Sequence, residues 1–283
     1  MSAKYSFDEL DHTHLLDGRP LYGTTTVLSV LAKPLTWWAS GLAVKELSGI
    51  QDPSVLTRIK NKKATKDEIH NVQVDVLRWL HEHEDIFGDI TSVQSVDAWI
   101  ALCDKAYRAH SVRLVDTAQA GIDLHFELER FIKNEMAGIK DTYDPKIAPF
   151  VNWTIENVDH FLWSEGYCYS EKHMVGGISD VGVCLMDTRI GIMDFKSSKS
   201  AYPSYFFQDA GYDICISENG ILDRNGNPMY KPDAPFDFYA VIPFGAPIVK
   251  PVFNSELNAT CEGCREAFLS ALTLYKQLQE MEQ

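Results

Sequence analysis

Two aspartates and a lysine stand in a predicted β-hairpin at positions where apolar side chains would be expected. Residues 176–200, GGISDVGVCLMDTRIGIMDFKSSKS, read as two strands joined by a short polar turn. Because side chains alternate along a strand, Asp194 and Lys196 share one face and their neighbours take the other. Antiparallel pairing about the turn brings Asp180 beside Asp194. The hairpin therefore predicts two carboxylates and an amine at one place.

Close carboxylates of this kind predict a divalent-cation site. Two adjacent carboxylates repel each other unless they share a proton or bind a cation, and one lysine offsets only part of their charge. Oxygen ligands suit Mg²⁺ or Mn²⁺, which bind through one or two carboxylates together with a substrate phosphate. Lys196 could then orient the attacking water or neutralise charge on the phosphate. The simpler alternative is a half-exposed sheet on which Lys196 forms an ordinary ion pair.

Predicted helices on either side of the hairpin carry further polar groups. In AGIDLHFELERF, His125 lies four residues after Gly121 and four before Glu129, so all three share a helix face. Gly121 would allow another backbone to come close, although a helical histidine is more often structural than a ligand. In FFQDAGY, Gln208 and Tyr212 are four residues apart on one face, which suits them to holding a phosphate or the lysine.

The ordered set resembles the RecB-like and phage exonuclease branch of the PD-(D/E)XK nuclease superfamily, which includes enzymes similar to the mitochondrial genome maintenance exonuclease. That branch has a helical GxxxH motif, a strand glutamate, GxxD, DxK and, on the next helix, QxxxY. The segment YGTTTVLSVLAKPLTWWA also looks like the start of phage and prophage members. In this chain the motifs fall at Gly121–His125, Glu171, Gly177–Asp180, Asp194–Lys196 and Gln208–Tyr212.

The resemblance implies a role for each group of residues. The metal ligands would be His125, Asp180, Asp194 and the backbone carbonyl of Phe195. The catalytic residues would be Asp180, Asp194, Lys196, Gln208 and Tyr212, with Lys196 assisting the water. Substrate contacts would come from Glu171, Ser197 and Ser198.

The activity implied by this resemblance is Mg²⁺- or Mn²⁺-dependent hydrolysis of DNA. We expect an exonuclease that acts on single-stranded ends in replication, recombination or repair, and in-line attack of water would leave a 5′-phosphate. Single-strand-binding or recombination proteins are candidate partners. One alternative is an endonuclease of the same superfamily acting on duplex or branched DNA. The other is a non-catalytic nucleic-acid-binding protein with this fold.

The elements that must position these residues predict a mixed α/β fold of the α+β type. In residues 113–283 the expected order is helix, three strands, helix, strand, helix. This order suits a PD-(D/E)XK, restriction-endonuclease-like core with a mixed central sheet flanked by helices. The helix before the first strand is expected to end at a C-cap on Gly166. Residues 1–112 predict an N-terminal helical lobe along the DNA path, interrupted by a mobile polar loop or flap at 48–68.

The chain is acidic, with 26 basic residues, 40 acidic residues and a formal net charge of −14. This balance argues against nonspecific coating of DNA or anionic lipid, so contact with nucleic acid must use local basic groups. The segment RIKNKKATK is one such group, and Lys60, Lys62 and Lys63 are expected to contact a DNA strand. Trp37 and Trp38 could stack on bases or, more simply, pack in a core.

Cysteine usage and the start of the chain predict a soluble, cytoplasmic protein. The six cysteines are scattered through a chain without an export signal, which favours free thiols. Cys103 and the CEGC segment at 261–264 could begin an iron–sulfur site, but no further cysteine follows, so we expect no cluster. No apolar stretch approaches the roughly 18 residues of a membrane span, so no membrane association is expected.

Overall fold

Two separate units make up the part of the chain that the structure describes. The structure is a computed structural model, and it describes residues 4–31, 36–84, 105–106, 109 and 119–281. The first unit combines residues 1–32 with residues 120–283, and the second unit is residues 33–119. The observed division thus differs from the predicted boundary at residue 112, because the N-terminal segment pairs and packs with the C-terminal part of the chain.

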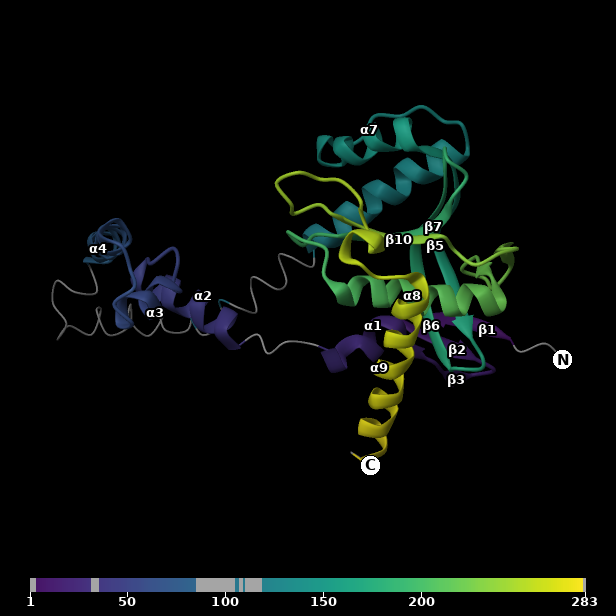
Figure 1. The fold of residues 1–283 in the computed structure, drawn as a ribbon, viewed down its shortest axis with the longest axis horizontal. Coiled ribbons are helices and arrows are strands. Elements are labelled where there is room, and N and C mark those ends of the chain that lie inside the picture. Colours follow the sequence, from purple (N-terminus) through teal and green to yellow (C-terminus); the bar gives the residue numbers. More distant parts are fainter. Residues whose placement is uncertain (1–3, 32–35, 85–104, 107–108, 110–118, 282–283) are drawn as a thin grey trace. The chain divides into compact units, whose positions relative to one another are not determined.

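A mixed eight-stranded sheet forms the centre of the first unit (Figure 1). Its main strands are β5 (Val158–Ser170), β6 (Val175–Leu185), β7 (Ile190–Lys196), β8 (Ile221–Leu222), β9 (Pro228–Tyr230), β10 (Phe238–Pro243) and β11 (Val252–Phe253). They lie in the order β11-β10-β7-β6-β5-β8-β9. Strands β5, β6 and β7 form an antiparallel meander, and β10 runs parallel to β7. The predicted mixed α/β architecture is confirmed at this level.

Helices cover both faces of this sheet (Figure 1). One face packs against α8 (Pro203–Asn219) and α9 (Cys261–Met281), the two helices predicted after the hairpin. The other face packs against a helix over 119–136 and α7 (Ala148–Asn157), which follows the short 3-10 turn η2 (Pro145–Ile147). Because both faces are covered, the central strands are apolar on both sides, and β10 is buried along its whole length. Charged residues inside such strands therefore need a specific reason.

The boundary between α7 and β5 differs from the predicted one. The helix ends at Asn157, and residues expected to continue it to a C-cap on Gly166 are strand instead. Strand β5 pairs with β6 over most of its length, which buries Trp163 completely. A side chain at Gly182 would place its Cβ 2.1 Å from the Trp163 ring, so β6 accommodates the indole with a glycine. Strand pairing and burial have overridden the helical periodicity of this segment.

The N-terminal segment adds a small sheet and a short helix to the first unit. An antiparallel sheet contains β1 (Tyr5–Asp8), β2 (Thr13–Leu16) and β3 (Arg19–Pro20). The segment continues through β4 (Tyr22–Gly23), α1 (Thr24–Val27) and the 3-10 turn η1 (Leu28–Leu31), close to the predicted strand-like turn and short apolar helix. Strand β4 pairs in parallel with the start of β6, and Val27 is buried in the core formed by α8 and α9.

The second unit is helical in its described part. It contains α2 (Thr36–Ser48), α3 (Val55–Lys60), α4 (Lys66–Glu82) and, among the later residues, only 105–106, 109 and 119. Helix α4 begins with a capping box in which Thr65 and Glu68 satisfy each other's backbone N–H groups. The predicted loop at 48–68 thus contains a helix, and Arg58 within it pairs with Asp52 and Glu68.

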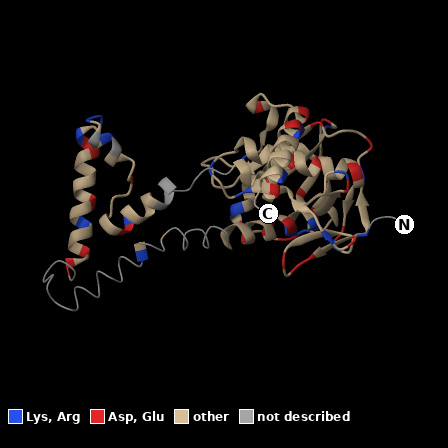
Figure 2. Ribbon diagram, turned by 90° about the horizontal axis from the view of Figure 1, so that it is seen from below, with Lys and Arg blue, Asp and Glu red and all other residues tan. Residues whose placement is uncertain are grey.

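Some sequence predictions fall on residues outside those described. These are the side chains of Trp37, Trp38 and Lys60, residue Cys103, and most of the amphipathic stretch at 95–110. Lys62 and Lys63 are exposed between α3 and α4, in the basic group that Figure 2 shows in the second unit. None of the described helices combines the length and the apolar character needed to cross a bilayer.

Candidate active site

Two buried carboxylates lie side by side on neighbouring strands. In the β6–β7 pair Val181 lies opposite Met193, so the next position sets Asp180 opposite Asp194, as the hairpin predicted. Asp180 is 8% exposed and Asp194 only 1%. Asp180 Oδ2 accepts a hydrogen bond of 2.7 Å from the backbone N–H of Phe195, which ties the two strands together beside the pair.

His125 reaches these strands from the helix over 119–136. Its Nε2–H donates to the carbonyl oxygen of Phe195 at 3.0 Å, a contact between residues 70 positions apart. Its Nδ1 lies 3.7 Å from Asp180 Oδ2 and 3.8 Å from Glu165 Oε1. The predicted set of His125, Asp180 and the Phe195 carbonyl is therefore brought together. The prediction that Gly121 allows another backbone to come close is wrong for the described residues. A Cβ at this position would meet none of their atoms within 4 Å.

Glu165 is a member of this group that the sequence reasoning missed. Ser164 pairs with Val181 and Gly166 with Ser179, so Glu165 lies across from Asp180. The ligand atoms of His125, Glu165 and Asp180 lie within 4.8 Å of one another. Glu165 has a φ of 50°, a rare value for a residue other than glycine. The observed register, in which Ser170 pairs with Val175, sets position 165 opposite 180, and local sequence patterns did not fix this register.

Glu171, predicted to be the strand glutamate of the motif, lies apart from the group. Glu171 is exposed in the turn between β5 and β6. Its backbone N–H donates to Glu218 Oε1 at 2.9 Å, a contact that stabilises the turn. Glu171 follows Glu165 by six residues. At roughly 3.3 Å per residue, this separates the two glutamates by up to about 20 Å. The chain leaves the sheet before Glu171 because β5 ends at Ser170.

Lys196 and Gln208 both contact Asp194. Lys196 Nζ lies 2.6 Å from Asp194 Oδ2 and also over the ring of Tyr205, 5.2 Å from its centroid. Gln208 Nε2 donates to the hydroxyl of Tyr212 at 2.7 Å and to Asp194 Oδ1 at 3.4 Å. The predicted pairing of Gln208 with Tyr212 on one face of α8 is thus confirmed, and the pair supports Asp194 from the helix side.

The glycine of the GxxD motif makes room for this support. A Cβ at Gly177 would lie 2.5 Å from the Tyr212 ring and 2.8 Å from Thr24 Oγ1, so α8 and α1 approach β6 closely there. A cavity of about 230 Å³ opens beside this contact and is lined by Phe7, His12, Thr25 and other residues of the N-terminal segment. A second cavity of about 170 Å³ shares Thr25 and is lined by Tyr205 and Gln208.

Ser197 and Ser198, predicted to contact substrate, follow Lys196 directly. Ser197 is exposed and Ser198 half-buried. Ser198 Oγ donates to the carbonyl of Ser200 at 2.8 Å. A Cβ at Gly245 would lie 2.5 Å from the Ser197 carbonyl, so the loop after β10 packs closely on this segment. Both serines adjoin the carboxylate pair in the chain, whereas Lys62 and Lys63 belong to the second unit and their role stays a prediction.

Burial and mutual repulsion shift the pKa values of the group. Burial, with the neighbouring Asp180, raises the pKa of Asp194 to about 6, although Lys196 opposes the rise. Burial also raises the pKa of Asp180. Burial lowers the pKa of His125, but Glu165, Asp180 and Asp194 outweigh that effect and raise it to about 9. A bound cation would relieve the repulsion that these shifts express.

The donor set fits a hard divalent cation. Although Lys196 Nζ is close, Asp194 Oδ2 receives no hydrogen bond of acceptable geometry from the described residues. Adjacent ligands of an octahedral ion at roughly 2.1 Å lie about 3 Å apart. His125 Nδ1 lies 3.7 Å from Asp180 Oδ2 and 3.8 Å from Glu165 Oε1, somewhat wider than that spacing. Three carboxylates, one carbonyl and one imidazole favour Mg²⁺ or Mn²⁺ over thiophilic metals.

A further buried carboxylate lies on α8. Asp209, next to Gln208 on α8, is fully buried, and neither of its oxygens has a hydrogen-bond donor among the described residues. Burial and the charges of Asp194 and Asp180 raise the pKa of Asp209 well above its usual range. A raised pKa favours the neutral form of this carboxyl. The carboxylates that line the candidate metal site are Asp180, Asp194 and Glu165.

Metal affinity is expected to rise with pH. An ion requires neutral His125 and ionised Asp194, whose pKa values are about 9 and about 6, so it must displace the histidine proton across this interval. We expect an affinity gain of about tenfold per pH unit between pH 6 and pH 9, measured by calorimetry with Mn²⁺. His125→Asn should flatten this slope, and an unchanged slope in that variant would show that His125 is no ligand.

The same pKa shifts determine how the stability of the metal-free protein changes with pH. Asp194 and His125 both bind protons more tightly in the folded chain than at their usual pKa values of 3.8 and 6.5. The free energy of unfolding should therefore fall as pH rises from about 4 to about 6, and again from about 6.5 to about 9. Saturating Mn²⁺ should reduce both losses, since it binds the deprotonated groups of the folded chain.

No family of known proteins matches the chain, and a search of curated proteins finds no match either. The geometry of the buried group is therefore the main guide to function. It combines paired carboxylates, a lysine and an imidazole at one end of the hairpin β6–β7.

Proposed function

We propose that the protein is a metal-dependent deoxyribonuclease with a PD-(D/E)XK-type core. The observation that carries the proposal is the buried pair of Asp180 and Asp194, with Lys196 on Asp194 and His125 beside Asp180. The order α7, β5, β6, β7, α8, β10, α9, with β10 parallel to β7, supports this core. Carboxylates inside strands that are otherwise apolar are stabilised when a divalent cation binds them.

The residues divide into ligands and groups that act on the substrate. His125, Glu165, Asp180, Asp194 and the Phe195 carbonyl would hold Mg²⁺ or Mn²⁺, which supplies Lewis-acid polarisation of the phosphate and lowers the pKa of water. Lys196 stays cationic, because Asp194 and Asp180 raise its pKa despite burial. It would neutralise charge that develops on the phosphate and orient the attacking water. Gln208 and Tyr212 would keep Asp194 in place.

Single-stranded ends are the proposed substrate. A net charge of −14 provides little long-range attraction for DNA, so capture must depend on local contacts. Two cavities, of about 230 and 170 Å³, are lined in part by Tyr212 and Gln208, the residues that adjoin Asp194. The rings of Phe7 and His12 at the larger cavity could stack on a base, an interaction open to single strands.

A comparison of linear and circular single strands tests the proposal. With Mg²⁺ or Mn²⁺, we expect end-labelled linear DNA to be degraded and a covalently closed circle of equal length to survive at least about a hundredfold longer. Gel analysis of both substrates at matched enzyme concentration gives the ratio. Equal cleavage of the circle would identify an endonuclease, as in the first alternative. Binding of either strand without any cleavage would identify a non-catalytic nucleic-acid-binding protein.

The assay needs a matched duplex and a matched RNA strand. Single-stranded DNA should be degraded faster than duplex DNA of the same sequence, because the proposed contacts require unpaired bases. The same strand as RNA reports whether the 2′-hydroxyl is tolerated. Faster degradation of the duplex would contradict the single-strand proposal while leaving the metal site in place.

A further inference from the structure

A second group of potential metal ligands lies at the start of β5, away from the carboxylate pair. We propose that Asp159, His160 and Cys184 bind a thiophilic divalent cation, with Zn²⁺ as the representative ion. Their ligand atoms lie within 4.8 Å of one another. The proposal is independent of the nuclease assignment, because none of these residues belongs to the group around Asp180.

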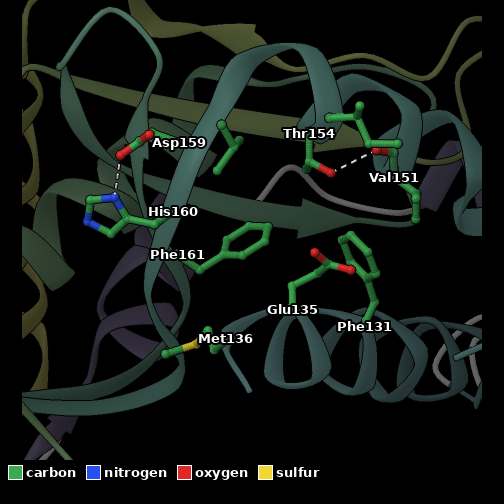
Figure 3. Close-up of a pocket in the computed structure, with 10 residues that line it drawn as sticks. Phe131, Glu135, Met136, Val151, Thr154, Asp159, His160 and Phe161 are labelled. Carbon is green, nitrogen blue, oxygen red and sulfur yellow. Dashed lines mark hydrogen bonds and ion pairs between the residues drawn. The ribbon is translucent and has the colours of Figure 1, made fainter. Parts of the chain in front are cut away.

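A β-bulge explains why these three side chains meet. Val158 pairs with Leu185 and His160 with Cys184, so Asp159 is an extra residue in β5 at a register shift. In a regular strand, Asp159 and His160 would point to opposite faces of the sheet. Instead Asp159 Oδ2 lies 2.7 Å from His160 Nδ1. Figure 3 shows the two side chains turned toward each other. The bulge turns two consecutive polar side chains toward one place, beside the cross-strand cysteine.

The donor set differs in kind from that of the proposed nuclease site. A thiolate, an imidazole and a carboxylate together suit Zn²⁺, whereas Mg²⁺ and Mn²⁺ prefer oxygen. Tetrahedral Zn²⁺ bonds of roughly 2.0–2.3 Å place ligand atoms about 3.3–3.7 Å apart, so small side-chain rotations would close the site. Three protein ligands leave a fourth position for water.

The surrounding charges favour a cation. Besides burial, the carboxylates of Asp159, Asp187 and Asp237 raise the pKa of the Cys184 thiol. Arg189 offsets part of this charge, since its guanidinium lies 2.9 Å from Asp187 Oδ2. A metal ion would displace the thiol proton and compensate the remaining negative charge.

The site is open to an incoming ion. The side chains of Asp159 and His160 are 59% and 57% exposed. Both also line a cavity of about 380 Å³ whose walls include Phe131, Glu135 and Phe161 (Figure 3). An ion held here would bridge β5 and β6 at the point where α7 gives way to the sheet, so it should stabilise that junction.

Cobalt titration tests the proposal with a readout other than cleavage. Co²⁺ bound by a thiolate gives a charge-transfer band, and Zn²⁺ should displace it. The titration uses tag-free, full-length protein carrying Asp194→Asn, a change that weakens binding at the proposed nuclease site. We expect one equivalent of Co²⁺ with the thiolate band. Cys184→Ser should remove the band, and His160→Ala should weaken binding at least about tenfold. Zn²⁺ should also raise the Tm of the Asp194→Asn protein, but not the Tm of the same protein with Cys184→Ser or His160→Ala added.

Cys261→Ser is the matched control, because Cys261 is another free, half-buried cysteine in the described chain. It should retain the band and the affinity. Loss of the band in Cys261→Ser, with retention in Cys184→Ser, would place the metal at Cys261 and Cys264 and overturn the proposal. So would a parent protein that shows no thiolate band at saturating Co²⁺. Neither result would affect the cleavage assay, so failure of this site and failure of the nuclease assignment are distinguishable.

Discussion

Asp194→Asn is expected to lower the rate of DNA cleavage by on the order of 10³-fold or more. Asp194 is the more buried carboxylate of the pair, and its Oδ2 forms an ion pair with Lys196 that a metal ion would have to share or displace. Asparagine keeps the shape and the contact with Gln208 but removes the charge. Metal affinity should therefore fall together with turnover.

The same substitution should leave the fold intact. In the metal-free chain, burial and Asp180 raise the pKa of Asp194 to about 6, so its ionisation at pH 8 opposes folding. We thus expect the Tm of Asp194→Asn at pH 8 to equal or exceed that of the parent. Cleavage of end-labelled DNA, Mn²⁺ calorimetry and thermal unfolding provide the three measurements. Asp187→Asn is the control, because Asp187 is an exposed carboxylate in the turn of the same hairpin. Cleavage above a tenth of the parent rate in Asp194→Asn would contradict the site.

Lys196→Ala is expected to lower cleavage by about 10²- to 10³-fold while metal binding persists. Lys196 Nζ forms an ion pair with Asp194 Oδ2 and is held near the ring of Tyr205. Removing the ammonium group takes away the charge that faces the phosphate but none of the proposed ligands. Because the lysine also competes with the ion for Asp194, Mn²⁺ affinity should stay constant or increase.

The contrast between the two variants is the sharper test. Turnover at saturating Mn²⁺ and the Kd for Mn²⁺ are measured for both, with Lys199→Ala as a control for an exposed lysine in the following loop. Asp194→Asn should lose both properties, and Lys196→Ala only the first. Loss of Mn²⁺ binding in Lys196→Ala, with its Tm unchanged, would show that the lysine organises the metal site and would assign it a different role.

Local patterns in the sequence were sufficient for the hairpin and the helix that follows it. Strand alternation and a short turn expected at 187–190 predicted Asp180 near Asp194, and the observed turn at 186–189 gives a register that sets the two opposite each other. The spacing of four residues between Gln208 and Tyr212 likewise predicts their contact on α8. Both predictions depend only on the side-chain periodicity of one strand pair or one helix, and a few neighbouring residues determine that periodicity.

Contacts between residues of different strands and helices could be identified only from the tertiary structure. The sequence alone led to Glu171 as the strand glutamate, whereas the β5–β6 register sets Glu165 across from Asp180. The end of α7 at Asn157 was likewise decided by pairing and by the burial of Trp163, which outweigh the helical periodicity of the segment. In both cases the deciding interactions are with β6, which follows later in the chain.

The sequence by itself determined which chemical groups are available and which of them are neighbours within one hairpin or one helix. The tertiary structure decided that His125 lies against the Phe195 carbonyl, because packing of the helix over 119–136 on the sheet closes a separation of 70 residues. It also decided that a bulge gathers Asp159, His160 and Cys184. Such contacts depend on register and packing across the whole sheet, and a local repeat in the sequence carries no information about either.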